Sequence, residues 1–248
     1  LKNKFNVVIN LAAQAGVRHS IKNPKVYFDN NLSGFFNLLD ISSKTKIKHF
    51  IFASTSSVYG NSKIFPVKEE QVSDKPLSFY AATKKCNEVL AYSYSNIFNL
   101  PCTCLRFFTV YGPYGRPDMA LFKFVNSIEN NLPIELYNDG KHIRDFTYID
   151  DVIEYIKLIL PKIPNGLVPY NVFNIGSNNQ KSLKYFVSLI KKNLNKKIKI
   201  RKLGLQKGDV YKTHADNNKI VKYVKKEYYT SIEKGVREYI AWYKDFYG

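Results

Sequence analysis

The chain has 248 residues, of which 45% are hydrophobic, so it can bury a substantial core as one domain or as a domain with a smaller lobe. It contains no run of about 18 apolar residues, so no transmembrane helix is expected. The net charge of +18 is compatible with nucleic-acid binding, but only six of the 38 basic residues are Arg, whose planar fork such recognition favours. We therefore expect neither a nucleic acid nor a membrane as partner.

The first half of the chain alternates between apolar runs and longer helical stretches. This alternation is typical of parallel strands joined by helices, and it predicts an α/β fold with a doubly wound parallel sheet. The predicted strands cover residues 7–11, 50–53 and 103–108, and the predicted helices cover residues 30–43 and 78–96.

The second half has a different character, with loop-rich segments and short strands such as residues 134–137. We expect residues 113–248 to form mainly a smaller lobe, with returns to the main sheet. Thr230 and Glu233 have the spacing of a capping box, which predicts a final helix that reaches Trp242.

The cysteines and histidines indicate neither a metal site nor a disulfide. Cys102 and Cys104 are two positions apart on a predicted strand, so their side chains share one face. We interpret this pair as inert core thiols, which fits a reducing cytoplasm. The four histidines are scattered without ligand spacing, so we assign no metal.

Tyr80 and Lys84 form the most informative pair in the sequence. They are four residues apart on a predicted helix, so the hydroxyl and the ammonium can face one pocket. A nearby ammonium moves the pKa of a tyrosine from its ordinary value of about 10 toward neutral pH. Tyr80 is then a candidate general base for a sugar or alcohol hydroxyl. The alternative is a solvated lysine beside a half-buried tyrosine, because this spacing arises readily in a chain with 19 Tyr.

A cluster of hydroxyl side chains precedes this pair. Ser54, Thr55, Ser56 and Ser57 directly follow the apolar run at residues 50–53. They are therefore expected at the carboxyl end of a buried strand, where open α/β sheets bind ligands.

Together, the two motifs resemble the extended short-chain dehydrogenase/reductase family, the NAD-dependent sugar epimerases and dehydratases. The resemblance implies a Rossmann-like fold, NAD as cofactor and a UDP-sugar as substrate. Residues 1–112 would be the remainder of the NAD-binding domain, and residues 113–248 mainly the substrate lobe. The similarity continues in chain order through residues 7–18, 29–34, 105–113, 144–151, 173–176 and 207–210.

The resemblance also implies roles for individual residues. Thr55, Tyr80 and Lys84 would be catalytic, with Tyr80 as the base, Thr55 positioning or relaying its proton, and Lys84 on the cofactor ribose. Besides Tyr80 and Lys84, the implied cofactor contacts are Leu11, Ala12, Ala13, Gln14, Asn30, Ser54 and Phe108. The implied substrate contacts are Arg18, Ser56, Ser57, Thr109, Arg116, Tyr137, Arg144 and Asp209.

Some of these substrate contacts have a more specific implied role. Arg116 and Thr109 would hold the carboxylate of the sugar or a neighbouring hydroxyl. Arg144 would pair with the diphosphate, Tyr137 would flank the uracil, and Asp209 would contact the nucleotide ribose.

Residues 115–124 are most similar to the UDP-glucuronate 4-epimerases. Ser56 and Ser57 stand where dehydratases of the family carry an Asp-Glu pair and decarboxylases a Glu, so the groups needed for elimination are absent from these positions. The sequence thus favours conversion of UDP-glucuronate to UDP-galacturonate through a 4-keto intermediate. The alternatives are another nucleotide-sugar epimerase, a decarboxylase, a dehydratase or a non-catalytic fragment.

The sequence contains no Gly-x-x-Gly-x-x-Gly and begins with Leu1. In the family, that loop places the cofactor pyrophosphate on a helix N-terminus. We interpret the chain as lacking the first strands of the fold, and a short protein that lost its cofactor is the alternative. The strand at residues 7–11 would then be a sheet edge that favours aggregation. We expect the chain alone to be poorly soluble, to bind NAD weakly and to be inactive, and the full-length protein to be a cytoplasmic homodimer.

Overall fold

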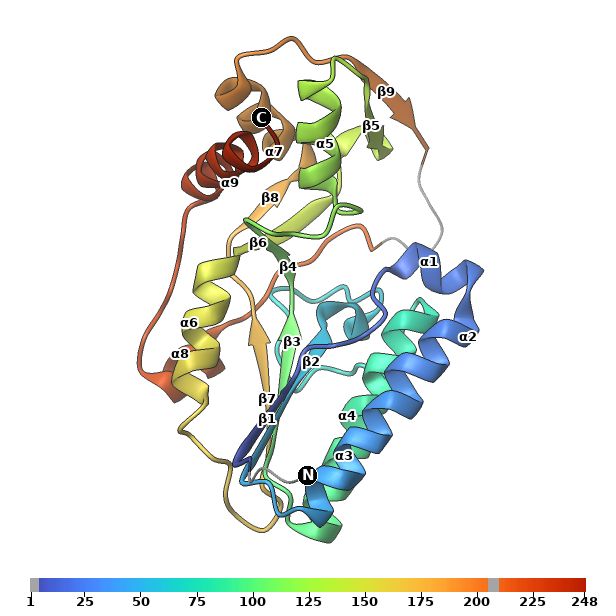
Figure 1. Cartoon of the computed structure of the whole chain (residues 1–248), viewed down its shortest axis with the longest axis vertical. Helices are drawn as coiled ribbons and strands as arrows, with labels where there is room; N and C mark the ends of the chain where they lie inside the picture. Colours follow the sequence, from blue (N-terminus) through green and yellow to red (C-terminus); the bar gives the residue numbers. More distant parts are fainter. Residues whose placement is uncertain (1–4, 205–209) are drawn as a thin grey trace.

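The computed structural model describes residues 5–204 and 210–248. A four-stranded parallel sheet in the order β1-β2-β3-β7 lies at its centre and confirms the predicted α/β fold (Figure 1). Because all four strands run the same way, their carboxyl ends meet at one edge, where open α/β sheets bind ligands. The strands are β1 (Val7–Asn10), β2 (His49–Thr55), β3 (Cys102–Phe107) and β7 (Tyr170–Ile175).

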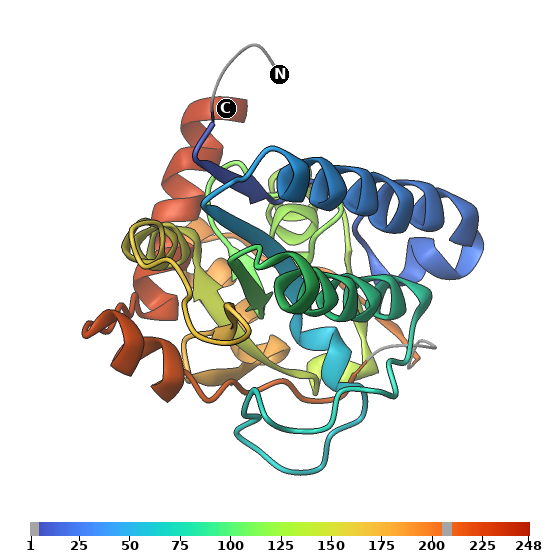
Figure 2. The same cartoon turned by 90° about the horizontal axis from the view of Figure 1, so that it is seen from below.

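Helices cover both faces of this sheet (Figure 1, Figure 2). Alternate side chains of a strand point to opposite faces, so Phe50 and Phe52 pack in one core and Ile51 in the other. Cys102 and Cys104 lie in the same core as Phe50, which confirms that they share a face. The helices on that side are α3 (Gly34–Lys44) and α4 (Phe79–Phe98), and those on the other side are α6 (Ile149–Ile159) and α8 (Asn218–Val224).

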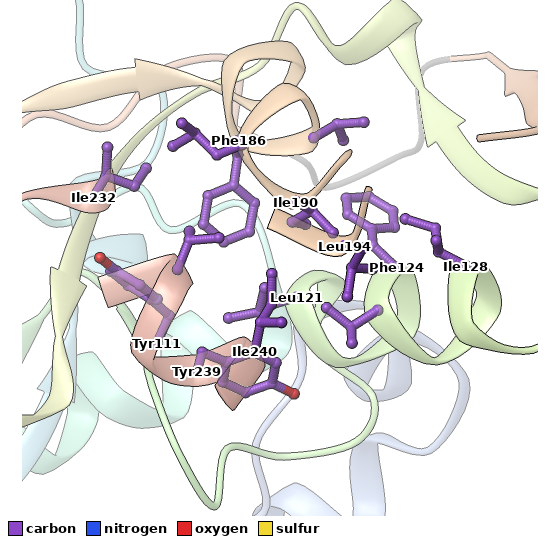
Figure 3. Close-up of a cluster of buried hydrophobic side chains, with 14 of the residues drawn as sticks. Tyr111, Leu121, Phe124, Ile128, Phe186, Ile190, Leu194, Ile232, Tyr239 and Ile240 are labelled. Carbon is purple, nitrogen blue, oxygen red and sulfur yellow. The ribbon is translucent and has the colours of Figure 1, made fainter. Parts of the chain in front are cut away.

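A lobe built from the second half of the chain lies beyond the carboxyl edge of the sheet (Figure 1). Phe186, Leu121 and Ile240, from three different helices, meet in its core (Figure 3). The boundary at residue 112 stays a prediction, and β7 is the return to the main sheet. The strands of the lobe are β4 (Thr109–Tyr111), β5 (Ile134–Tyr137), β6 (Ile143–Tyr148), β8 (Gln180–Ser182) and β9 (Ile200–Leu203), and its helices are α5 (Ala120–Glu129), α7 (Leu183–Leu194) and α9 (Ile232–Tyr247).

The segment after β1 differs from the single helix predicted at residues 30–43. α1 (Val17–Lys22) and α2 (Pro24–Tyr27) lead into a π-helix, η1 (Phe28–Ser33), and α3 follows without a break. A π-type turn inserts an extra residue into the helical repeat. Here it accompanies an inward side chain at Asn31, which is buried, while Asn30 is exposed.

The capping box predicted at Thr230 is wrong by one residue. Ser231 caps α9, because its hydroxyl accepts a hydrogen bond from the Lys234 N–H at 3.2 Å. Thr230 instead binds Asp151 of α6, donating its N–H at 2.7 Å and its hydroxyl at 2.9 Å. The carboxylate of Asp151 engages Thr230 through a tertiary contact that no local pattern indicates.

β1 lies at one edge of the sheet within the described part of the chain, as predicted. The side chains of Phe5, Ile9 and Leu11 along it are 54%, 41% and 50% exposed. Among the described residues β1 pairs with β2 on one side only, and an edge strand with exposed apolar side chains is one to which another strand can add.

Candidate functional site

Thr55, Tyr80 and Lys84 lie together at the carboxyl edge of the sheet. Thr55 is the last residue of β2, and the other two lie in the first turns of α4, which Ser78 caps with its hydroxyl. The Lys84 ammonium donates to the Ala53 carbonyl of β2 at 2.9 Å. The hydroxyls of Thr55 and Tyr80 are hydrogen-bonded to each other. The structure thus brings the three predicted catalytic residues together, and their roles stay predictions.

Burial dominates the acidity of Tyr80. It raises the pKa of the phenol, while the hydrogen bond to Thr55 and the charge of Arg116 lower this pKa only in part. The expectation that Lys84 makes Tyr80 more acidic is wrong for this structure, in which the ammonium is directed at the Ala53 carbonyl. Tyr80 therefore holds its proton at neutral pH.

Burial shifts the pKa of Lys84 downward, the opposite direction from the shift of Tyr80. The side chain is 4% exposed, and burial lowers the pKa of its ammonium to about 8. Burial disfavours whichever form of a group is charged, so the same environment raises the pKa of a phenol and lowers that of an amine.

The loop after β1 is fastened to α4 by Asn31. The Gln14 N–H donates to Asn31 Oδ1 at 2.8 Å, and Asn31 Nδ2 donates to the Gln14 carbonyl at 3.0 Å and to Thr83 Oγ1 at 3.1 Å. The predicted cofactor contact Asn30 is exposed and donates to the Val26 carbonyl instead. Asn30 was a contact implied by the family resemblance, whereas in the π-helix η1 the buried side chain is that of its neighbour Asn31. Three further predicted contacts on the loop are exposed: Leu11, Ala12 and Ala13.

Tyr27 belongs to the site and was missed from the sequence. Its ring packs edge-on against that of Tyr80 at 6.2 Å, and its hydroxyl donates to the carbonyls of Ala15 and Gly16 at 2.8 and 2.6 Å. Gly16 has a φ of +107°, a conformation that side chains disfavour. The Gly16 turn was the available signal, because it directs the loop back toward Tyr80.

Arg116 reaches the site from the lobe side. A Cβ on Gly16 would lie 3.8 Å from Arg116 Nη2, so the guanidinium borders the Gly16 turn. It pairs with Asp118 through two hydrogen bonds, 2.9 Å from Nε and 2.6 Å from Nη2. Both side chains are exposed, so Arg116 is held by a partner that solvent or a substrate can replace. Asp118 was not predicted.

Arg18 and Tyr137 meet across the gap between α1 and the lobe. The Arg18 guanidinium lies 4.5 Å from the centre of the Tyr137 ring, a cation–π contact between two predicted substrate residues. Arg144 lies apart from them on β6 and donates to the Ile143 and Tyr211 carbonyls at 3.0 Å.

The hydroxyl side chains after β2 point in different directions. Ser54 is buried and donates to Glu88 Oε1 at 2.6 Å, so its hydroxyl faces the interior under α4. Ser56 and Ser57 lie in the 3-10 turn η2 (Ser56–Tyr59) and are half-buried. The Ser57 N–H donates to Thr55 Oγ1 at 3.2 Å, which fixes the start of this turn.

Phe108 and Thr109 follow the end of β3. Phe108 is buried, and Thr109 is half-buried at the start of β4. Phe108 and Ser56 line a small crevice of about 10 Å³ together with Thr213. The remaining predicted substrate contact, Asp209, lies outside the described residues.

None of three further features of the described residues adds a residue to this site. No three His, Cys, Asp or Glu side chains in residues 5–204 and 210–248 are grouped so as to hold a metal ion. Within the same ranges, no helix combines the length and apolar character needed to span a bilayer. A hollow of about 490 Å³ is lined by residues 161–165, Asn171 and Tyr223. It lies at the amino end of the sheet and contains no predicted site residue, so we do not assign it to this site.

Comparison with known proteins gives consistent matches. A sequence profile of the NAD dependent epimerase/dehydratase family matches residues 1–176. Protein CapI of Staphylococcus aureus is 46% identical over 255 residues, which cover 97% of this chain and 76% of that protein. The probable UDP-glucuronate 4-epimerase of Rhizobium meliloti (strain 1021) is 41% identical, with 97% of this chain and 75% of that protein covered.

The fold is also similar to a solved structure. The crystal structure of UDP-glucuronic acid 4-epimerase from Bacillus cereus, in complex with UDP-glucuronic acid and NAD, superposes with a TM-score of 0.92 at 34% identity. The match covers 98% of this chain and 76% of that one.

Replacing Lys84 with Met is expected to stabilise the chain at neutral pH. The lowered pKa of about 8 represents a cost of about 3 kcal/mol for the buried charge, and loss of the bond to Ala53 offsets about 1 kcal/mol of the gain. Between pH 8 and about 10 the unfolded lysine binds a proton that the folded one has released, so wild-type stability rises with pH there. This rise should disappear in Lys84→Met.

Denaturant unfolding at pH 7, 9 and 10 measures both effects. Lys123→Met, at an exposed position of α5, is the control and should change neither. An unfolding free energy at pH 7 that is unchanged or lower in Lys84→Met would contradict the prediction.

Proposed function

The chain belongs to the NAD dependent epimerase/dehydratase family, and we propose that it inverts C4 of a UDP-hexuronic acid, interconverting UDP-glucuronate and UDP-galacturonate. The observation that carries the proposal is the hydrogen-bonded pair of Tyr80 and Thr55 beside a turn whose side chains are hydroxyls, Ser56 and Ser57. Reversible oxidation at C4 needs a base for one hydroxyl proton. Elimination of water needs an additional carboxyl acid, and these turn positions do not supply one.

The residues at the sheet edge fit NAD, the cofactor of the family. The donor set consists of the buried Lys84 ammonium, the Tyr80 phenol and the exposed loop at residues 11–13, and it suits a polar dinucleotide across the carboxyl ends of parallel strands. We propose that Lys84 and Tyr80 hold the ribose, with the loop and Phe108 completing the contact. When bound, NAD accepts the hydride of C4 and returns it.

In this proposal, Tyr80 and Thr55 carry out the transfer of the C4 hydroxyl proton. Tyr80 takes the proton of the C4 hydroxyl, and Thr55, bonded to Tyr80, positions that hydroxyl or relays the proton. Because burial raises the pKa of Tyr80, positive charge must assist the transfer, and Arg116 is the cation whose charge already lowers this pKa.

A uronic acid imposes a further requirement. The 4-keto intermediate is a β-keto acid, which loses CO₂ when its carboxylate bond aligns with the carbonyl π system. We propose that Arg116 exchanges Asp118 for the substrate carboxylate and holds it out of that alignment, with Thr109 as a second donor.

The proposed contacts to the nucleotide part of the substrate remain Arg18, Tyr137, Arg144 and Asp209. The homodimer is retained too, with exposed apolar side chains of α3 and α4, such as Phe36 and Val89, as a candidate surface.

The reaction itself is tested with UDP-glucuronate and NAD. The protein, with any residues that its reading frame encodes before Leu1, is incubated with both, and products are resolved by mass and sugar NMR. UDP-galacturonate of unchanged mass is the expected product. Loss of CO₂ or water would show a decarboxylase or a dehydratase, and absence of any conversion would contradict the proposal. The 248-residue chain run in parallel is expected to be inactive, because its sequence holds no glycine-rich loop.

Tyr80→Phe should lower kcat by at least about 100-fold, with little change in UDP-sugar affinity, because it removes the base and leaves the ring in place. Single-turnover kinetics and calorimetric titration separate the two quantities. Tyr92→Phe, an exposed position on the same helix, is the control and should be neutral. Near-normal turnover of Tyr80→Phe would exclude it as the base.

Arg116→Ala should release a UDP-pentose beside the epimer, because the carboxylate of the keto intermediate is then free to rotate. Mass analysis of the product mixture detects the pentose and the CO₂ loss. Asp118→Ala removes the resting partner of Arg116 but keeps the guanidinium, so it should give no pentose. A pentose-free product from Arg116→Ala would move the guarding role to another residue.

A further inference from the structure

A buried ion pair lies directly behind the Tyr80 and Lys84 pair. Glu88 follows Lys84 by one helical turn on α4, and Arg106 lies in β3; each is 3% exposed. Arg106 binds the carboxylate with two parallel hydrogen bonds, 2.9 Å from Nε to Oε1 and 2.8 Å from Nη2 to Oε2. Burial acts to raise the pKa of Glu88, but Arg106 and Ser54 hold it below its usual range, so the carboxylate is ionised.

The same carboxylate fastens α4 to β2. Ser54 donates to Glu88 Oε1 at 2.6 Å, and Ser54 stands opposite Arg106 in the parallel register of the two strands. The preceding residue of β2, Ala53, accepts the hydrogen bond of Lys84. Two successive turns of α4 are therefore bonded to the two residues that lead into Thr55.

The other end of Arg106 reaches the hydroxyl turn. Arg106 Nη1 donates to the Tyr59 hydroxyl at 2.8 Å, and Tyr59 is the last residue of η2, which also carries Ser56 and Ser57. Nη1 also donates to the Glu69 carbonyl at 3.1 Å. One guanidinium thus connects the helix that bears Tyr80 with the turn that bears the other site hydroxyls.

Stability alone does not account for such a pair. Replacing a buried ion pair with apolar side chains of similar volume is often neutral or stabilising, because the desolvation of two charges offsets their attraction. What bidentate bonds add is direction, since both the angle and the distance are fixed. In active sites a displacement of about 1 Å can cost roughly 100-fold in rate.

We propose that Glu88 and Arg106 are positioning residues. They fix where α4 lies along the sheet and how it is rotated about its axis, so that Tyr80 and Lys84 lie beside Thr55. This inference rests on the catalytic role proposed for Tyr80. It adds two residues that touch neither substrate nor cofactor and act through the helix and the turn.

The test removes both charges together, in the double variant Glu88→Met with Arg106→Met, assayed with NAD in the protein that includes any residues its reading frame encodes before Leu1. We expect it to fold, to keep KM for UDP-glucuronate within about twofold, and to lose at least about tenfold in kcat. The matched control removes an ion pair of the lobe, Lys196→Met with Glu129→Met, and should keep kcat.

A second readout does not depend on turnover. Tyrosine labelled with ¹³C at Cζ reports each phenol by NMR, and the Tyr80 signal is assigned by its loss in Tyr80→Phe. In the double variant we expect this signal to shift and its titration midpoint to move toward the ordinary tyrosine value, because Tyr80 leaves its half-buried position against Tyr27. In the lobe control it should not move.

These outcomes separate the inference from the proposed function. A wild-type protein inactive on UDP-glucuronate would defeat the proposed function, while the Tyr80 signal would still decide the positioning role. Wild-type kcat and an unmoved Tyr80 signal in the double variant would overturn the inference. Should the double variant not fold, Glu88→Gln, which keeps the shape and the contact to Ser54, is measured instead and judged by the same two readouts.

Discussion

The attachment of α4 to the ends of β2 and β3 is the constraint on which the site depends. The parallel register places Ser54 opposite Arg106, and Glu88 of the helix binds both. Apolar packing holds the helix against the sheet, and the directed bonds add a fixed angle and distance. Under the proposed positioning role, Tyr80 and Lys84 take their positions from Glu88, which lies two turns and one turn further along the same helix.

Burial at this edge acts on both titratable groups and favours their neutral forms. It raises the pKa of Tyr80 and lowers that of Lys84. Under the proposed function, proton transfer to Tyr80 then depends on charge brought from elsewhere. Arg116 already lowers the Tyr80 pKa from the lobe side, so the residue proposed to grip the sugar carboxylate also acts on the base. Under the proposed function, substrate binding and the strength of the base would therefore be coupled through one guanidinium.

The sequence predicted the features that repeat or lie close together along the chain. Apolar period placed β2 and β3, and the spacing of Tyr80 and Lys84 placed both at the strand end near Thr55. The misses were contacts between distant segments and departures from regular helical geometry. The side chain of Asn31 faces inward because of a π-type turn that α-helical periodicity does not encode.

The same limit explains why the ion pair behind the site was not predicted. Arg106 looks like one polar residue in an apolar strand, and Glu88 like one acidic residue on a helix. Only the register of β2 with β3 and the packing of α4 bring them together.

Residues from the second half of the chain help to hold the hydroxyl turn η2. Asn174 of β7 is fully buried and accepts the Tyr59 hydroxyl at 2.6 Å, while its Nδ2 donates to the carbonyls of Val67 and Asp216. Asp216 lies beyond the residues that match the family profile, yet it helps to hold the partner of η2. A buried amide that loses a hydrogen-bond partner destabilises its surroundings. Loss of the segment around Asp216 would therefore weaken the hydrogen bond of Asn174 to Tyr59, and through Tyr59 the one to Arg106. The turn η2 is thus held from both halves of the chain.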